Sequence, residues 1–190
     1  MTVVHLINAS LDGRCGHRNV IPDDDLHAHA LSTIADADSL LFGAGTYRLL
    51  APHWSHMADE QSESPTINEF ATTLAAKPKI VFSSTATPLP NWNSTVEDTD
   101  PTARVSELLE GGATKLVIQA SPQLARTLRR AGLVNQLRLL MQPLVAGDGP
   151  ALFEPDERYE LTLTGIQRTR SGAPKPWTTS STSRRRDLPG

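Results

Sequence analysis

The sequence has few of the features that mark secreted or membrane proteins. Its 190 residues contain one cysteine, Cys15, so no disulfide can form within the chain. A single cysteine fits a protein of a reducing compartment. No apolar run approaches the roughly 20 residues that a membrane-spanning helix needs, and the first residues lack the basic segment of a signal peptide. We therefore expect a cytoplasmic protein that does not enter a membrane.

Charge of neither sign dominates the sequence. The formal net charge is −3, from 18 Lys and Arg and 21 Asp and Glu residues, which gives no long-range attraction to nucleic acid or anionic lipid. The three arginines at 184–186 follow a Ser- and Thr-rich stretch and are typical of a solvated tail. With 38% hydrophobic residues, the chain is expected to fold as one soluble domain without nucleic acid as a partner.

The histidines do not form a metal-binding pattern. His27 and His29 are two residues apart on an expected helix, so they point to different faces. His53 and His56 could share a helical face, but no third ligand follows from their spacing. We therefore expect no metal site, and we expect Cys15 to be a structural thiol.

Short apolar runs alternate along the chain with segments of helical spacing. Strands are expected at residues 3–7, 39–42, 79–83, near 95–96, and at 115–118, 137–145 and 159–166. Helices are expected at residues 22–34, 46–50, 66–75, 102–109 and 122–131, with Pro52 ending the second and a polar loop over 53–65. This order predicts an α/β domain over residues 1–170 with a mostly parallel sheet covered on both faces, followed by a poorly ordered tail, 171–190.

Three strand-to-helix junctions are candidates for ligand binding: 43–46, 83–85 and 120–123. Each offers backbone N–H groups and a Ser or Thr hydroxyl at the end of a strand, where open α/β sheets bind ligands. Taken alone, Gly43 and Gly45 are consistent with a phosphate cradle or with a tight turn. They are not a Rossmann fingerprint, because Arg48 stands where the third glycine would be. On neighbouring strands, the three junctions together would form a surface for a dinucleotide.

A set of motifs in a fixed order gives the chain a family resemblance. The motifs are INASLDG (7–13), LLFGAGTY (40–47), APHW (51–54), INEFA (67–71), KPKIVFSS (77–84) and the long segment 116–153. In this order they resemble the dihydrofolate reductase-like superfamily, and specifically the reductase domain of bacterial riboflavin biosynthesis. The resemblance implies a three-layer α/β/α domain with a sheet of about eight strands, often a homodimer. It also implies hydride transfer from NADPH or NADH to a small heterocyclic or carbonyl substrate.

The resemblance also implies roles for individual residues. The cofactor positions fall on Asn8, Gly43, Ala44, Gly45, Thr46, Ser83, Ser84, Ala120 and Ser121. The implied catalytic residues are Asp25 and Asp12, and Asp25 would anchor the substrate ring and assist its protonation. Asp24 and Trp54 would contact the substrate. From the residues alone, the acidic cluster 23–25 could equally cap a helix and complement its dipole.

Three positions differ from the family's pattern. Ala44 and Ser84 stand where the family commonly has arginine, and Ala120 stands where it has glycine. Each lost charge-assisted contact to phosphate is worth on the order of 1.5–3 kcal/mol of binding free energy. Because NADPH carries one more phosphate than NADH, the absence of these arginines leaves the preference between the two cofactors open. Two alternatives to a reductase follow: a family member that binds a small molecule without redox turnover, and one that performs non-redox biosynthetic chemistry.

Overall fold

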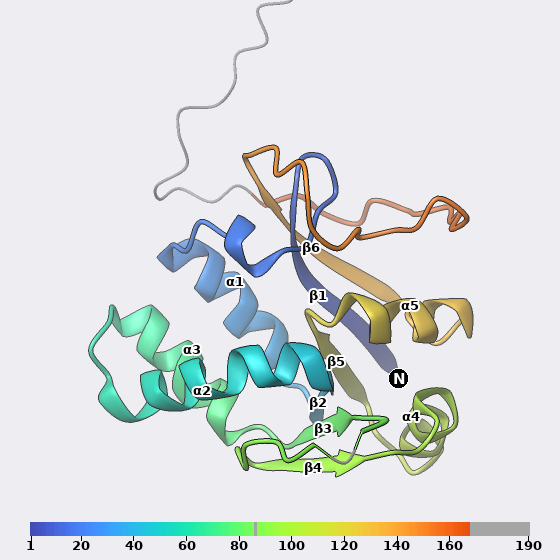
Figure 1. Cartoon of the computed structure of the whole chain (residues 1–190), viewed down its shortest axis with the longest axis horizontal. Coiled ribbons are helices and arrows are strands. Elements are labelled where there is room, and N and C mark those ends of the chain that lie inside the picture. Colours follow the sequence, from blue (N-terminus) through green and yellow to red (C-terminus); the bar gives the residue numbers. More distant parts are fainter. Residues whose placement is uncertain (86, 168–190) are drawn as a thin grey trace, which may run out of the picture.

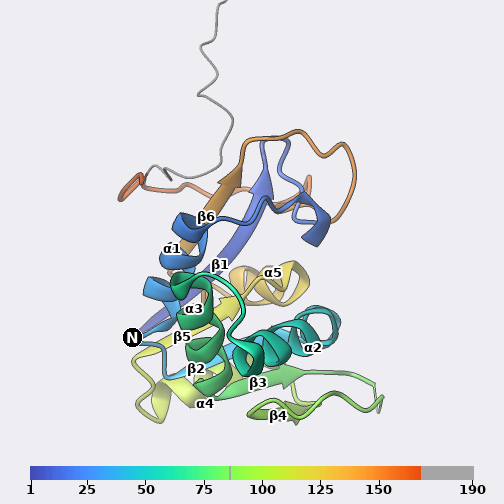
Figure 2. The same cartoon turned by 90° about the vertical axis from the view of Figure 1, so that its left-hand side faces the viewer.

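The computed structural model describes residues 1–85 and 87–167 (Figures 1 and 2). The expected tail at 171–190, with its arginines at 184–186, and the domain boundary near residue 170 lie outside these residues. Within them, no helix combines the length and the apolar character needed to cross a membrane.

The central sheet has six strands among the described residues, in the order β4-β3-β2-β5-β1-β6. Each neighbouring pair in this sheet is parallel. Parallel strands buried on both faces consist of nearly continuous apolar residues, which is the pattern the sequence displays. The strands are β1 (Thr2–Ser10), β2 (Ser39–Gly43), β3 (Lys79–Phe82), β4 (Ser94–Glu97), β5 (Lys115–Gln119) and β6 (Gln136–Gln142).

Helices cover both faces of the sheet and complete three layers, as predicted (Figures 1 and 2). Alternate residues of each strand point to opposite faces, so Val4 and Leu6 pack with α1, α2 and α3, whereas Val3 packs with α4 and α5. The helices are α1 (Asp24–Ile34), α2 (Ala44–Glu60), α3 (Pro65–Ala76), α4 (Pro101–Glu110) and α5 (Pro122–Arg130), with a short 3-10 helix η1 (His17–Asn19) before α1.

Polar side chains cap the start of three helices. Asp23 accepts a hydrogen bond from the Leu26 backbone N–H at 2.7 Å, and Ser64 and Asp100 do the same for α3 and α4. Such a cap satisfies one of the N–H groups that a helix start leaves unpaired. At least one member of the acidic cluster 23–25 is therefore a helix cap.

The expected strand over residues 159–166 is wrong, and the described sheet has six strands where about eight were predicted. Leu161 and Leu163 alternate as a strand would, but they are 67% and 74% exposed. The preceding segment is held against α5, because Arg129 pairs with Glu157 at 3.2 Å. Anchored there, the chain does not pair along the outer edge of β6.

The expectation that Pro52 ends the second helix is also wrong. Helix α2 runs from Ala44 to Glu60 with Pro52 inside it, and residues 53–60 are helical where a loop was expected. An internal proline costs a helix about 3 kcal/mol through its missing N–H and its ring. Tertiary packing offsets this cost, since the Trp54 ring meets Phe70 of α3 with centroids 4.8 Å apart.

A buried histidine holds β1 to the end of β5. His5 is fully buried, its Nε2 lies 2.8 Å from the carbonyl oxygen of Ala120, and its Nδ1 lies 3.4 Å from Arg129. Nε2–H therefore donates to the carbonyl while Nδ1 accepts from the guanidinium. Burial lowers the pKa of His5 to about 4, so the ring is neutral at pH 7.

This histidine predicts a loss of stability in mild acid. Between pH 6.5 and 4 the unfolded chain holds a proton on His5 that the folded chain does not, so lowering the pH favours unfolding. The free energy of unfolding, measured by urea titration, should fall by roughly 2 kcal/mol between pH 7 and pH 5. The exposed-site control His56→Gln should keep this fall. The His5→Gln variant should flatten it, and an unchanged slope in that variant would contradict the assignment.

Candidate functional site

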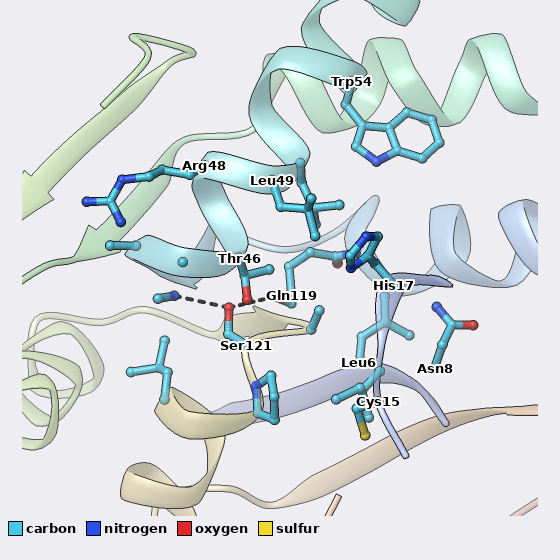
Figure 3. A pocket seen from close by; sticks show the side chains of 18 of the residues that line it. Leu6, Asn8, Cys15, His17, Thr46, Arg48, Leu49, Trp54, Gln119 and Ser121 are labelled. Atoms are coloured by element: carbon cyan, nitrogen blue, oxygen red, sulfur yellow. Dashed lines mark hydrogen bonds between the residues drawn. The ribbon is translucent and has the colours of Figure 1, made fainter. Parts of the chain in front are cut away.

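An open cavity of about 1300 Å³ lies at the carboxyl ends of the sheet strands (Figure 3). It is larger than the roughly 300–1,000 Å³ typical of a pocket for one small ligand. Strands β1, β2, β3 and β5 end at it, and α1, α2 and α3 contribute side chains to its walls. Its size suits two ligands side by side or one long ligand.

The three predicted junctions meet in this cavity. Residues 43–46 begin α2 after β2, residues 83–85 follow β3, and residues 120–123 lead from β5 into α5. All of them line the cavity, and the sheet order places β3, β2 and β5 side by side. The junctions therefore lie on neighbouring strands, as a dinucleotide surface requires. The cofactor-binding roles of these residues remain predictions.

The two glycines of the first junction differ in their surroundings: a Cβ atom added to Gly43 would contact Leu124 at 3.9 Å and Ser121 at 4.0 Å, whereas Gly45 faces open space. Neither Gly43, with φ of −81°, nor Gly45 has the positive φ that would require glycine for a turn. A Cβ atom added to Gly45 would meet no protein atom within 4 Å. Of the two interpretations left open by the sequence, the geometry favours a backbone that leaves room for a ligand over a tight turn.

The third junction is strained and ties three strands together. Ala120 and Ser121 have φ of 51° and 49°, a left-handed conformation that costs an L-residue roughly 1–2 kcal/mol. The Ser121 hydroxyl accepts from the Gly43 N–H at 3.0 Å and donates to the Gln119 carbonyl at 2.9 Å (Figure 3). The Ala120 N–H donates to the Leu6 carbonyl at 2.8 Å. The ends of β1, β2 and β5 are thereby held at fixed positions.

Gln119 supplies an unpaired acceptor. Its Oε1 atom is buried and has no hydrogen-bond partner among the described residues, although the side chain lines the cavity (Figure 3). A buried acceptor left unpaired costs about 1–3 kcal/mol. A ligand with an N–H donor would satisfy it, and the carboxamide of a nicotinamide ring is such a donor. The residues at this position therefore fit a nicotinamide cofactor.

Asn8 presents a donor beside the same space. Its Oδ1 accepts from Gln142 Nε2 at 2.8 Å, and Gln142 Oε1 in turn accepts from the Ile21 N–H at 2.9 Å. These bonds fix the orientation of the Asn8 amide and leave its Nδ2 as the group available to a ligand. Asn8 lines the cavity (Figure 3), and its expected position beside the cofactor remains a prediction.

The predicted catalytic carboxylates are not among the residues that line the cavity. Asp12 accepts from the Ser10 hydroxyl at 2.6 Å and from the backbone N–H groups of Ala146 and Gly147 at 2.9 and 2.8 Å, and these hydrogen bonds, chiefly that from Ser10, lower its pKa. Its position is therefore that of a loop anchor. Asp24, a predicted substrate contact, accepts from the Ser64 hydroxyl at 2.5 Å.

His27, rather than Asp25, faces the cavity from α1. Leu26, His27 and Ala30 line the cavity, and Asp25 lies outside this face of the helix. Helical periodicity explains the difference, because Asp25 shares its face with the exposed Ala28 and not with the apolar side. The sequence did contain this signal: the apolar face through Leu26 and Ala30 includes position 27.

The His27 ring is held in one orientation. Its Nδ1 lies 2.7 Å from the Asp23 carbonyl oxygen, to which it donates, and Nε2 has no hydrogen-bond partner among the described residues. The rings of Trp54 and Phe70 flank it, with centroids 5.6 and 5.5 Å away. Trp54, a predicted substrate contact, lines the cavity next to this histidine. This part of the cavity thus combines the aromatic rings of Trp54 and Phe70 with the imidazole of His27.

Sequence reasoning missed several other lining side chains. Glu63 and Asp98 contribute carboxylates, and His17 and His53 contribute further imidazoles. No group of three His, Cys, Asp or Glu side chains within residues 1–85 and 87–167 could hold a metal ion. Cys15 also lines the cavity, but burial raises the pKa of its thiol to about 11, so it is not a thiolate at neutral pH.

Comparison with known proteins identifies the family. The sequence model of the RibD C-terminal domain matches residues 2–173, and the chain belongs to that family, as its motifs predicted. An uncharacterized protein named YyaP from Bacillus subtilis (strain 168) is 25% identical over 136 residues, which cover 71% of this chain and 70% of that protein.

Solved structures share the fold at low sequence identity. A provisionally assigned riboflavin biosynthesis protein from Shewanella sp. PV-4 is 19% identical, with a TM-score of 0.59 over 84% of this chain and 86% of that one. A diaminohydroxyphosphoribosylaminopyrimidine deaminase/5-amino-6-(5-phosphoribosylamino)uracil reductase from Thermotoga maritima is 13% identical, with a TM-score of 0.56. This chain is covered to 89% in that match but spans only 54% of the Thermotoga chain. These likenesses establish the α/β fold.

The strained turn predicts that Ala120→Gly stabilises the protein. Glycine adopts the left-handed conformation without the Cβ penalty, so the free energy of unfolding should rise by about 1 kcal/mol. Urea titration of the variant against the wild type measures this change. The matched control Ala28→Gly, in the exposed middle of α1, should lower stability by about 1 kcal/mol. A loss of stability in Ala120→Gly would contradict the strain argument.

Proposed function

We propose that the chain is an NAD(P)H-dependent reductase that transfers hydride to a small heterocyclic or carbonyl substrate. The observation that carries this proposal is the single cavity that joins the three strand-end junctions to the pocket around His27 and Trp54. A nucleotide surface and an aromatic substrate pocket in one space are what a hydride transfer requires, because donor and acceptor carbons must come into contact. Membership of the RibD C-terminal domain family supports the same class of reaction.

One end of the cavity has the groups to hold a dinucleotide. The backbone of 43–46, the hydroxyls of Thr46 and Ser84, and the amides of Asn8 and Gln119 would hold it through hydrogen bonds. When bound, NADPH or NADH would supply a hydride from its nicotinamide ring. The preformed positions of these groups reduce the ordering that binding requires.

The other end has the groups to hold and protonate a substrate. Trp54, with Phe70 packed against it, offers an apolar surface to a flat ring, and the imidazole of His27 lies beside both. Reduction of a C=N or C=O bond consumes one hydride and one proton. We assign the transfer of this proton to His27, because His27 lines the cavity. The doubly protonated ring would give up the proton on Nε2 and keep its Nδ1–H bond to the Asp23 carbonyl, becoming neutral. This is the role that the sequence led us to expect for Asp25. Asp12 would contribute by fixing the loop at 146–147.

A second candidate function has support from the residues of the three strand-to-helix junctions. Ala44 and Ser84 remove two phosphate-binding arginines of the family, and Ala120 adds a Cβ atom where the family has glycine. These changes favour a family member that binds a small molecule, or acts on a biosynthetic intermediate, without nicotinamide turnover.

Cofactor titration separates the two candidates. Isothermal calorimetry of the purified protein with NADPH and with NADH should detect binding of at least one at micromolar to millimolar concentration. Mixing the complex with a panel of cyclic imines and aldehydes should then lower the absorbance of the reduced nicotinamide. No binding of either nucleotide at millimolar concentration would reject the reductase. Binding without oxidation by any panel member would favour the second candidate.

Replacing His27 should slow turnover without weakening cofactor binding. Loss of a general acid typically costs roughly 10²-fold or more in rate. We expect His27→Gln to lower kcat by about that factor for the best substrate of the panel, with the Kd for the cofactor unchanged. His29→Gln is the matched control, since His29 lies on the same helix but does not line the cavity. Equal rates in the two variants would remove His27 from the reaction.

A further inference from the structure

Among the described residues that line the cavity, Arg48 is the one lysine or arginine. Arg48 lies in α2 one helical turn after Ala44, and both residues line the cavity. Side chains four residues apart in an α-helix lie on the same face, one above the other. A guanidinium at position 48 can therefore reach the region that an arginine at position 44 would serve.

The Arg48 guanidinium is largely unused within the described part of the chain. One of its nitrogens donates to the Thr85 hydroxyl at 3.4 Å, and none of the ion pairs between described residues includes it. A guanidinium has five N–H donors in a planar fork that matches the geometry of a phosphate. The contact with Thr85 places this fork at the end of β3, next to Ser84.

Arg48 lies far from the groups assigned to the reaction. β5 and β2 separate β1, which carries Asn8, from β3, so the two strands are about 14 Å apart. Figure 3 shows Arg48 on the opposite side of the first turns of α2 from Trp54 and His17. If the nicotinamide lies beside Asn8 and Gln119, a dinucleotide that crosses the strand ends places its adenosine at the β3 end. NADPH differs from NADH there, by a 2′-phosphate on the adenosine ribose.

We propose that Arg48 binds the 2′-phosphate of NADPH and replaces, from a new position, the arginines that the family has after Gly43 and Ser83. This inference rests on the proposed reductase function. Asp98, which follows β4, also lines the cavity, and its carboxylate would repel a phosphate bound there. A charge-assisted contact alone would favour NADPH by about 10- to 100-fold, so the opposing charge places the expected preference near the lower value.

Binding measurements test this role without turnover. Calorimetry would give the Kd of NADPH, NADH and the fragment 2′,5′-ADP for the wild type, Arg48→Gln and the control Arg138→Gln. The control removes the same charge from an exposed site on β6 that does not line the cavity. We expect Arg48→Gln to weaken NADPH and 2′,5′-ADP roughly tenfold or more and to leave NADH unchanged. We expect Arg138→Gln to change none of the three.

A double variant tests the proposed replacement. Adding Ala44→Arg to Arg48→Gln should restore NADPH affinity to within a few-fold of the wild type, since it returns a guanidinium to the same helix face. If Arg48→Gln leaves the ratio of the NADPH and NADH affinities unchanged, the inference fails while the reductase stands. An equal loss for both dinucleotides also overturns it, because the contact would then be to a group they share. If the wild type binds neither, the proposed function fails as well.

Discussion

The turn at Ala120 and Ser121 is the constraint on which the site depends. Its left-handed backbone brings the Ser121 hydroxyl between two strand ends, where it bonds the Gly43 N–H and the Gln119 carbonyl. The same turn meets β1 through the Leu6 carbonyl and the buried imidazole of His5. Without these bonds, the junctions would be separate loops. With them, they form a continuous floor, and the strain of the turn is offset by the hydrogen bonds that it makes possible.

The two ends of the cavity above these junctions differ in chemical character. Toward β3 it carries exposed donors and one guanidinium, which suit an anionic and extended ligand. Toward α1 and α3 it is lined by aromatic rings and by the imidazoles of His27 and His53, which suit a flat and weakly polar ligand. If charge stabilises binding at one end and proton transfer occurs at the other, as proposed, affinity and chemistry can be changed independently by substitution.

Much of the fold was predictable because buried parallel strands and capped helices leave local signals. The strand ends at 43, 83 and 120 follow from apolar runs broken by small or polar residues, and their meeting follows from parallel topology. Pro52 and the segment 159–166 were predicted wrongly, because tertiary packing and the ion pairs of α5 override local propensity there. The imidazole of His27 could have been predicted from the apolar face of α1. The contact between Arg48 and Thr85 could not, because it joins elements whose distance no local pattern encodes.

The position of β1 within the sheet has a consequence for how the chain folds. β1 begins at residue 2, yet its partners are β5, where Thr2 aligns with Lys115, and β6, where Val4 aligns with Gln136. During synthesis the first strand therefore remains unpaired until β5, more than 100 residues later in the chain, has been made. Pairing over such separations slows folding, since the entropy of closing long loops is lost before the contacts form. The apolar residues of β1 thus stay without their sheet partners in the nascent chain until β5 and β6 have been made.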